Sequence, residues 1–204
     1  MKKAIITICA LLIFPAFIQA QEHRIGVGVG GASGAYTFST TEIDLVGEMV
    51  ELPVYLYVSK VGFMAGAKIM EFAVRGKLTS GVITTNVSYT QSLLSLTLGW
   101  NFQLADRLSI APQIVNSYMG SSRVQFSSYQ EDPFLGQFVI AADSYNQNAS
   151  LSGYEIPIYY TGDIFVLGLK LCGYNSGADI EFPSTTKGRI DINGGIAFVM
   201  EANF

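Results

Sequence analysis

Apolar and polar residues alternate along much of this chain, most clearly near its C-terminus. One parity of the last segment holds Ile190, Ile192, Gly194, Ile196, Phe198, Met200, Ala202 and Phe204. The other parity holds Arg189, Asp191, Asn193, Gly195, Ala197, Val199, Glu201 and Asn203. Because successive side chains of a β-strand point to opposite faces, this pattern predicts a strand that ends on Phe204. We expect its first face to meet lipid and its second face to line a polar lumen.

Seven segments upstream show similar alternation, so the sequence predicts eight strands. These segments cover residues 25–29, 50–58, 63–69, 94–102, 108–114, 154–160 and 165–171. The connections between them are of two kinds. Short ones lie near Ser59-Lys60, Leu104-Ala105-Asp106 and Gly162-Asp163, and long polar ones cover 39–48, 72–90, 117–150 and 173–187. Short turns at one end and long loops at the other are typical of outer-membrane barrels. The predicted fold is all-β: a closed eight-stranded antiparallel transmembrane β-barrel, connected as an up-and-down meander.

Two other architectures fit part of this pattern. A soluble eight-stranded barrel also alternates, but only 14% of this chain is charged, whereas soluble domains carry about 25%. Aromatic residues also fall at predicted strand ends, as in the girdles of membrane barrels, at Trp100, Phe102, Tyr160 and Phe165. Within 117–150, Val124-Gln125-Phe126 and Phe138-Val139-Ile140 are expected to extend the neighbouring strands above the membrane as a protruding hairpin. As two further membrane strands they would make ten, but no further outer loop would match them. Eight strands in a membrane remain the prediction.

The N-terminus carries the features of an export signal. Lys2 and Lys3 precede an uncharged run from Ala4 to Phe17, which is followed by Ala20 at a plausible cleavage point. We expect residues 1–20 to be a cleaved signal peptide and 21–204 to be one barrel domain. Residues 21–204 contain no apolar run of about 20 residues, the length that a membrane-spanning helix needs. The predicted location is the outer membrane of a Gram-negative cell, with both termini in the periplasm.

Two predicted hairpins resemble each other and place charges at equivalent lumen positions. Glu51-Leu52-Pro53-Val54-Tyr55 leads to Gly66-Ala67-Lys68-Ile69, and Glu155-Ile156-Pro157-Ile158-Tyr159 leads to Gly168-Leu169-Lys170-Leu171. Two-residue turns at Ser59-Lys60 and Gly162-Asp163 would set Glu51 opposite Lys68 and Glu155 opposite Lys170. The same register sets Pro53 opposite Gly66 and Pro157 opposite Gly168.

These charges predict an ion-pair network inside the barrel. An eight-stranded barrel is filled by its own side chains, and charges inside it require partners. The predicted members are Glu51, Lys68, Glu155, Lys170, Arg107, Arg189 and Glu201. The favoured interpretation is a packed, structural lumen, and the alternative is a narrow porin-like channel for ions or small solutes.

The strand Tyr154-Glu155-Ile156-Pro157-Ile158-Tyr159, with its weaker copy at 51–55, resembles the Glu-Ile-Pro strand of a bacteroidete-type family of outer-membrane β-barrel proteins, often labelled PorT-like. This resemblance implies a barrel similar to OmpA and OmpX, without implying an activity. The last strand also resembles the signal read by the barrel-assembly machinery, carried here by Phe204, Ala202, Met200 and Phe198. An accessory role in a secretion apparatus is implied by the family label alone.

Little in the sequence predicts catalysis. Known barrel enzymes use a histidine base, and the single histidine here is His23, just after the predicted cleavage point. No catalytic residue, cofactor site or metal site is predicted, and the acidic residues Glu131, Asp132 and Asp143 lack the spacing of a calcium loop. Export and a net charge of −4 exclude a nucleic-acid partner.

The expected partners are therefore those of a surface barrel. We expect contacts with outer-membrane lipid and lipopolysaccharide, and with the assembly machinery during insertion. Loops 72–90 and 117–150 are the candidate binding sites for a surface protein or glycan.

Overall fold

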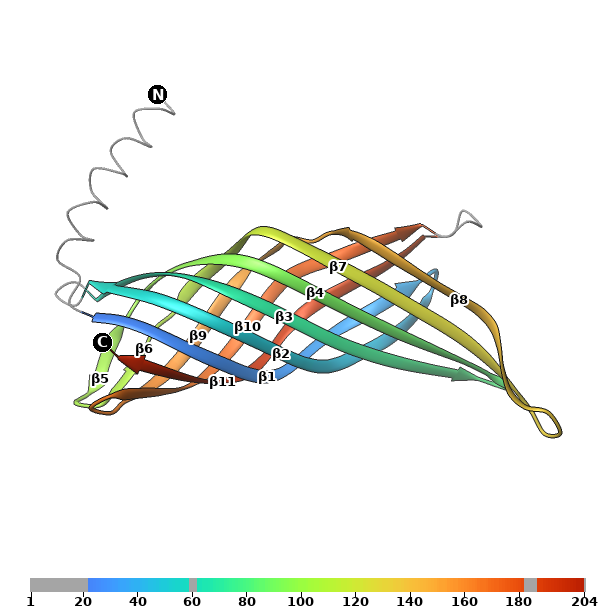
Figure 1. The fold of residues 1–204 in the computed structure, drawn as a ribbon, viewed down its shortest axis with the longest axis horizontal. Coiled ribbons are helices and arrows are strands. Elements are labelled where there is room, and N and C mark those ends of the chain that lie inside the picture. Colours follow the sequence, from blue (N-terminus) through green and yellow to red (C-terminus); the bar gives the residue numbers. More distant parts are fainter. Residues whose placement is uncertain (1–21, 59–61, 182–186, 204) are drawn as a thin grey trace, which may run out of the picture.

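The computed structural model describes residues 22–58, 62–181 and 187–203, and this part of the chain is built from β-strands (Figure 1). Among the described residues, no helix is long and apolar enough to cross a membrane. The predicted signal peptide 1–20, the turn at Ser59-Lys60 and Phe204 lie outside the described residues. The strands are β1 (Glu22–Phe38), β2 (Thr41–Val58), β3 (Phe63–Ser80), β4 (Ile83–Trp100), β5 (Phe102–Ala105), β6 (Leu108–Ile110), β7 (Gln113–Asp132), β8 (Gly136–Asn148), β9 (Leu151–Thr161), β10 (Phe165–Glu181) and β11 (Lys187–Asn203).

Antiparallel hydrogen bonding connects these strands into a ring of eight. The ring runs β1, β2, β3, β4, β7, β9, β10 and β11, and β11 pairs with β1. The short strands β5 and β6 extend the ring at one end, where β6 pairs with β9. The strand β8 pairs only with β7 among the described residues, so the hairpin within 117–150 adds no strand to the ring. The prediction of an eight-stranded antiparallel β-barrel is confirmed.

The β5–β6 turn, the start of β1 and the end of β11 lie at one end of the barrel (Figure 1). An apolar belt surrounds this end. We call this part the belt half. Its outward side chains are aliphatic or aromatic and solvent-exposed, and they alternate with buried inward ones. The belt includes Ile25, Val27, Val29, Val50, Leu52, Val54, Ile69, Leu94, Leu96, Leu98, Ile114, Ile158, Leu169, Leu171, Ile196, Phe198 and Met200, with Trp100, Phe102, Tyr160 and Phe165 toward the short turns.

The strands continue far beyond this belt, in what we call the protruding half. The predicted loops 39–48, 72–90 and 173–187 are wrong in large part, because β2, β3, β4, β10 and β11 occupy most of them. The protruding hairpin predicted within 117–150 is confirmed as β7 and β8. Alternation persists there, but the apolar side chains now point inward and the polar ones outward. On β2, Ile43, Leu45 and Met49 are buried inside the barrel, while Asp44 and Glu48 are exposed. Outward polar residues made these strands look like loops.

One residue separates the two senses of alternation on β11. Gly194 has a φ of +133°, and the ladder with β1 pairs Ser33 with Gly194 and then Gly34 with Ile192, which leaves Asn193 unpaired. Such a bulge shifts the parity of everything beyond it. Ile190 and Ile192 are therefore buried inside, whereas Ile196, Phe198 and Met200 are outside. The prediction that 190–204 presents one lipid-facing side is therefore wrong for the residues before Gly194.

Candidate functional site

The two similar hairpins are paired two residues away from the predicted register. Thr161 pairs with Val166, and the Gly162 N–H donates to the Phe165 carbonyl at 2.7 Å, so Asp163-Ile164 forms the turn. As a result, Lys170 lies opposite Pro157, and Tyr159 opposite Gly168. The β2–β3 hairpin repeats this arrangement, with Lys68 opposite Pro53 and Tyr55 opposite Gly66. The predicted Glu–Lys and Pro–Gly oppositions are wrong, but the inward parity of these residues holds.

Inside the belt half, four charged side chains meet at the centre of the barrel. Lys68 Nζ lies 3.2 Å from Glu51 Oε2 and also donates to Glu155. Lys170 Nζ lies 3.3 Å from Glu155 Oε1 and also donates to Glu51. Each lysine thus contacts both glutamates, and each of the four side chains is at most 1% exposed. The pairing crosses the lumen from one hairpin to the other, in addition to running within each hairpin.

Neutral side chains fill the remaining hydrogen-bonding positions of this network. Gln113 Nε2 donates to Glu155 Oε2 at 2.6 Å and to the Tyr55 hydroxyl at 3.3 Å. The Tyr174 hydroxyl donates to Glu155 Oε1. A buried carboxylate is tolerated only when its lone pairs are satisfied, and Glu155 has both lysines and two neutral donors around it. Gln113 and Tyr174 were missed in the sequence, because neither is charged and Tyr174 lies in a predicted loop.

A second buried ion pair lies beside the network on the side of the strand termini. Arg24 Nη1 is 3.9 Å from Glu201 Oε2, and the Arg24 guanidinium carbon lies 5.8 Å from the centre of the Tyr159 ring. Arg24 was missed, although it shares its parity with Gly26 and Gly28 and so had to point inward. A Cβ at Gly28 would stand 2.6 Å from Glu51 Cγ, so the absent side chain leaves room for that glutamate.

Two of the seven predicted network members lie elsewhere. The Arg107 side chain is 57% exposed and pairs with Asp163 at 3.4 Å, because it stands in the β5–β6 turn. Arg189 pairs with Asp179 at 2.9 Å and with Asp191 at 2.8 Å on the outside of the protruding half. The bulge at Gly194 explains its position, since it turns Arg189 and Asp191 outward. The structure brings together Glu51, Lys68, Glu155 and Lys170, with Glu201 close by.

Above the network, the interior of the protruding half is mainly apolar, with a small hydrogen-bonded cluster of Tyr89, Gln91 and Ser176. Its buried side chains include Leu45, Met49, Met70, Phe72, Val74, Leu93, Val124, Leu151, Ile180, Ile190 and Ile192. Phe72 and Tyr174 pack edge to face, with ring centres 5.6 Å apart. Burial in this core raises the pKa of Tyr36 to about 12. The ion-pair network and this core together occupy the middle and the far end of the lumen.

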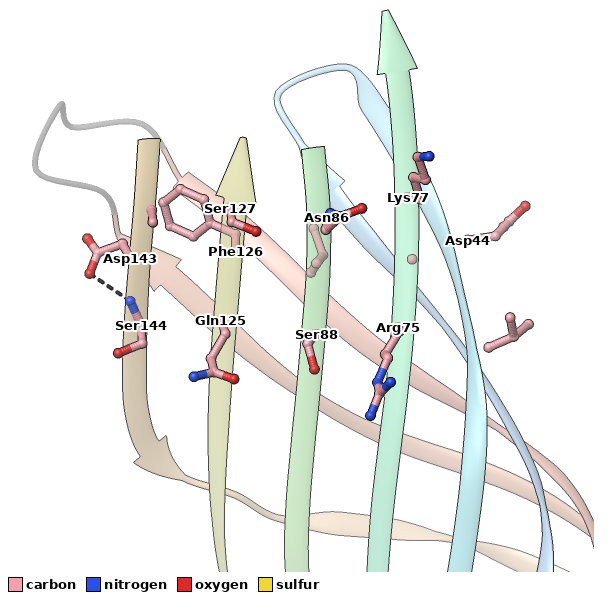
Figure 2. A pocket seen from close by; sticks show the side chains of 14 residues that line it. Asp44, Arg75, Lys77, Asn86, Ser88, Gln125, Phe126, Ser127, Asp143 and Ser144 are labelled. Atoms are coloured by element: carbon pink, nitrogen blue, oxygen red, sulfur yellow. Dashed lines mark hydrogen bonds between the residues drawn. The ribbon is translucent and has the colours of Figure 1, made fainter. Parts of the chain in front are cut away.

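A cavity of about 1020 Å³ lies on the outer face of the protruding half (Figure 2). It crosses β2, β3, β4, β7 and β8, and we call it the outer groove. Small polar side chains form its middle, namely Asn86, Ser88, Gln125 and Ser127. Arg75, Lys77 and Asp44 lie on one side of it and Asp143 on the other, where the Ser144 N–H donates to Asp143 Oδ1 at 2.7 Å. This groove could not be predicted from the sequence, because its residues fell in three separate predicted loops.

The β7–β8 hairpin ends in two exposed apolar side chains, Phe134 at 95% and Leu135 at 82% exposure. Asp132 Oδ1 accepts hydrogen bonds from the backbone N–H groups of both residues, at 2.8 and 2.9 Å. These two donors lower the pKa of the Asp132 carboxyl. The turn is therefore held in a conformation that directs Phe134 and Leu135 away from the barrel.

The remaining candidate chemistry is scattered. His23 is exposed on β1, and the thiol Cys172 is free and partly buried on β10. Within residues 22–58, 62–181 and 187–203, no three His, Cys, Asp or Glu side chains gather as metal ligands would. The proposed assembly-signal residues Phe198 and Met200 face outward in the belt, and Ala202 is half-buried.

Comparisons with known proteins place the fold. No family model and no curated protein matches the chain. Among solved structures, the outer membrane protein OprG from Pseudomonas aeruginosa is 10% identical, with a TM-score of 0.51 over 91% of this chain and 97% of that chain. The outer membrane protease OmpT from Escherichia coli is 9% identical, with a TM-score of 0.51 over the same shares, 91% and 97%. At such identities the likeness concerns the fold alone: this chain is a β-barrel of the outer-membrane type.

Proposed function

We propose that this protein is a non-enzymatic, integral outer-membrane β-barrel whose lumen is closed and whose protruding half is an interaction surface. One observation carries the proposal: the belt half is apolar outside and ionic inside, while the protruding half is mainly polar outside and mainly apolar inside. An apolar exterior on every strand of the belt suits lipid, and a polar exterior suits water. The belt half is then the anchor, with lipid and lipopolysaccharide around it and both termini in the periplasm.

The interior of the barrel supports closure. Glu51, Lys68, Glu155 and Lys170 neutralise each other across the lumen, and an ion that entered would have to break these contacts. Beyond them, Met49, Met70, Phe72 and Leu93 fill the path with apolar side chains that cannot replace the hydration shell of an ion. A porin-like role therefore has less support than a structural plug.

The outer surface supports binding. The outer groove offers hydroxyl and amide groups from Ser88, Gln125, Asn86 and Ser127, with charges of both signs beside them. Such a lining suits a hydrophilic ligand such as a surface glycan, and the exposed hairpin tip suits a protein. The finer assignment of a PorT-like family rests on the Glu-Ile-Pro strand around Pro157 and its copy around Pro53, and an accessory role in secretion rests on that family label alone.

Single-channel recording tests closure. The mature protein in planar lipid bilayers is expected to be electrically silent, because the ion-pair network and the apolar core fill its lumen. Steady openings of the unmodified protein would contradict the proposal and restore the channel.

A further inference from the structure

The second edge of β8 carries no partner among the described residues. β8 pairs with β7 from Ser121–Asn148 to Asp132–Gly136, and it stands at one end of the strand order. The neighbouring strand β10 pairs with β9 only as far as Ser176–Leu151, and beyond that point it continues with β11. Among the described residues the ring thus opens beside β8, whose second edge is paired with no strand.

Natural edge strands usually carry lysine, proline or inward charges that discourage pairing with another chain. β8 reads Gly-Gln-Phe-Val-Ile-Ala-Ala-Asp-Ser-Tyr-Asn-Gln-Asn, with no lysine, arginine or proline and a single acid, Asp143. Every residue from Gly136 to Ser144 is exposed, including Phe138, Val139 and Ile140. A bulge where Val139 and Ala141 pair with Tyr129 and Ser128 is the one protective feature of the strand. Such an edge is suited to strand addition.

We infer that the occupant of this edge is β8 of a second copy of the protein, held in a facing membrane. This inference rests on the proposed function, because it needs the belt half in lipid and the hairpin pointing away from it. Copies in one membrane share an orientation, so their β8 strands would run parallel. Copies in facing membranes are inverted, so their β8 strands run antiparallel and present the same edge to each other.

Antiparallel pairing of identical edges closes about a two-fold axis, so it satisfies both strands without propagating into a fibre. It is also slightly more stable per residue than parallel pairing. The place of β8 favours contact across a gap, since the β7–β8 hairpin is the part of the described chain that lies farthest from the belt half (Figure 1). The exposed Phe134 and Leu135 at its tip would then lie against the protruding half of the partner copy.

Vesicle clustering tests the inference. The mature protein is reconstituted into two populations of phosphatidylcholine vesicles that carry donor and acceptor dyes, and energy transfer is followed after mixing. Unmodified protein is expected to cluster the vesicles, and Ala142→Lys in β8 is expected to slow clustering about tenfold by charging the edge. Thr90→Lys is the matched control, because it adds the same charge on the outer face of β4, away from any edge and outside the outer groove, and clustering should persist. Dispersed vesicles with the unmodified protein, or equal clustering with Ala142→Lys, would overturn the inference.

Crosslinking separates facing copies from neighbours. In a Cys172→Ser background, Ala142→Cys is placed in both vesicle populations with two different epitope tags. A short thiol crosslinker is expected to join copies with different tags, whereas products joining only copies with the same tag would contradict the facing arrangement. The same vesicles report on the proposed function: inserted, electrically silent protein that fails to cluster refutes the pairing of β8 and leaves the closed anchor standing.

Discussion

The belt half and the protruding half of this barrel use the same strands and opposite arrangements of polarity. On β2, Leu52 is 51% exposed and Glu51 is buried, whereas a few residues away Leu45 is buried and Asp44 is exposed. In the belt half the interior is held by ion pairs, and in the protruding half by apolar packing as in a water-soluble barrel. The comparison teaches that one strand can carry apolar side chains outward in one half and inward in the other. The medium outside each half decides which of its two faces is apolar.

The largest expected effect comes from removing one charge of the lumen network. Lys170→Met leaves Glu51 and Glu155 with one cation between them, and breaking a buried ion pair in this way costs about 3–5 kcal/mol. We expect that loss in the free energy of unfolding, measured by urea titration in lipid vesicles. Arg107→Ala removes an exposed pair with Asp163 and should leave the midpoint unchanged.

Removing all four charges sharpens this result. A variant with Glu51→Gln, Lys68→Met, Glu155→Gln and Lys170→Met leaves no uncompensated ion, so it should be more stable than the single variant. If the quadruple variant unfolds more easily than Lys170→Met, the ion pairs stabilise the fold by more than it costs to bury their charges. Our account of the network would then be incorrect.

The second effect tests the apolar interior of the protruding half. Leu45→Ala leaves a cavity in a packed core and should lower the free energy of unfolding by about 3 kcal/mol. Leu52→Ala on the same strand faces the belt, where lipid can fill the space, so its effect should be below about 1 kcal/mol. Equal losses in the two variants would mean that the two halves do not differ in what surrounds them.

The third effect concerns the bulge where β11 changes sense. At Gly194 an added Cβ would stand 2.1 Å from the Cys172 carbonyl oxygen, and the φ of +133° strains any other residue. Gly194→Ala should cost about 1–3 kcal/mol, measured by the same titration. Gly31→Ala is the control, since its Cβ would meet only the Gly47 oxygen at 3.9 Å. A silent Gly194→Ala would show that the bulge is not required.

The smallest effect lies on the surface of the protruding half. Arg189→Ala removes pairs with Asp179 and Asp191 that are open to solvent, so the free energy of unfolding should fall by less than about 1 kcal/mol. The difference should vanish at about 1 M salt, where the screening length is near 3 Å. A loss that survives high salt would place Arg189 in an unscreened environment.

Much of this structure could be predicted from alternation. The eight strands, the inward parity of Glu51 and Lys68 and the outward parity of the belt follow from a period of two, which is local information. The register was misplaced because it depends on which two residues form a turn, and Asp163-Ile164 turns instead of Gly162-Asp163. A shift of one residue in the turn moves every opposed pair by two.

The protruding half was harder to foresee for a physical reason. Its outward residues are polar, so β3 beyond Phe72 and β4 before Thr90 resembled a loop, although Phe72, Val74, Val87 and Tyr89 keep the period of a strand. The inversion on β11 depends on a bulge at Gly194, which no periodic pattern contains. The outer groove forms where five strands lie side by side, so the sequence of any one strand is not enough to predict it.

The central claim is that the two halves face different surroundings, and accessibility along β11 tests it most directly. Single spin labels at Arg189, Ile190, Ile192, Ile196, Phe198 and Met200, in a Cys172→Ser background in vesicles, are probed with a lipid-soluble and a water-soluble relaxing agent. We predict that labels at Ile196, Phe198 and Met200 meet the lipid-soluble agent, that the label at Arg189 meets the water-soluble one, and that labels at Ile190 and Ile192 meet neither. Lipid contact at Ile190 and Ile192, continuing the alternation without a break at Gly194, would contradict the account.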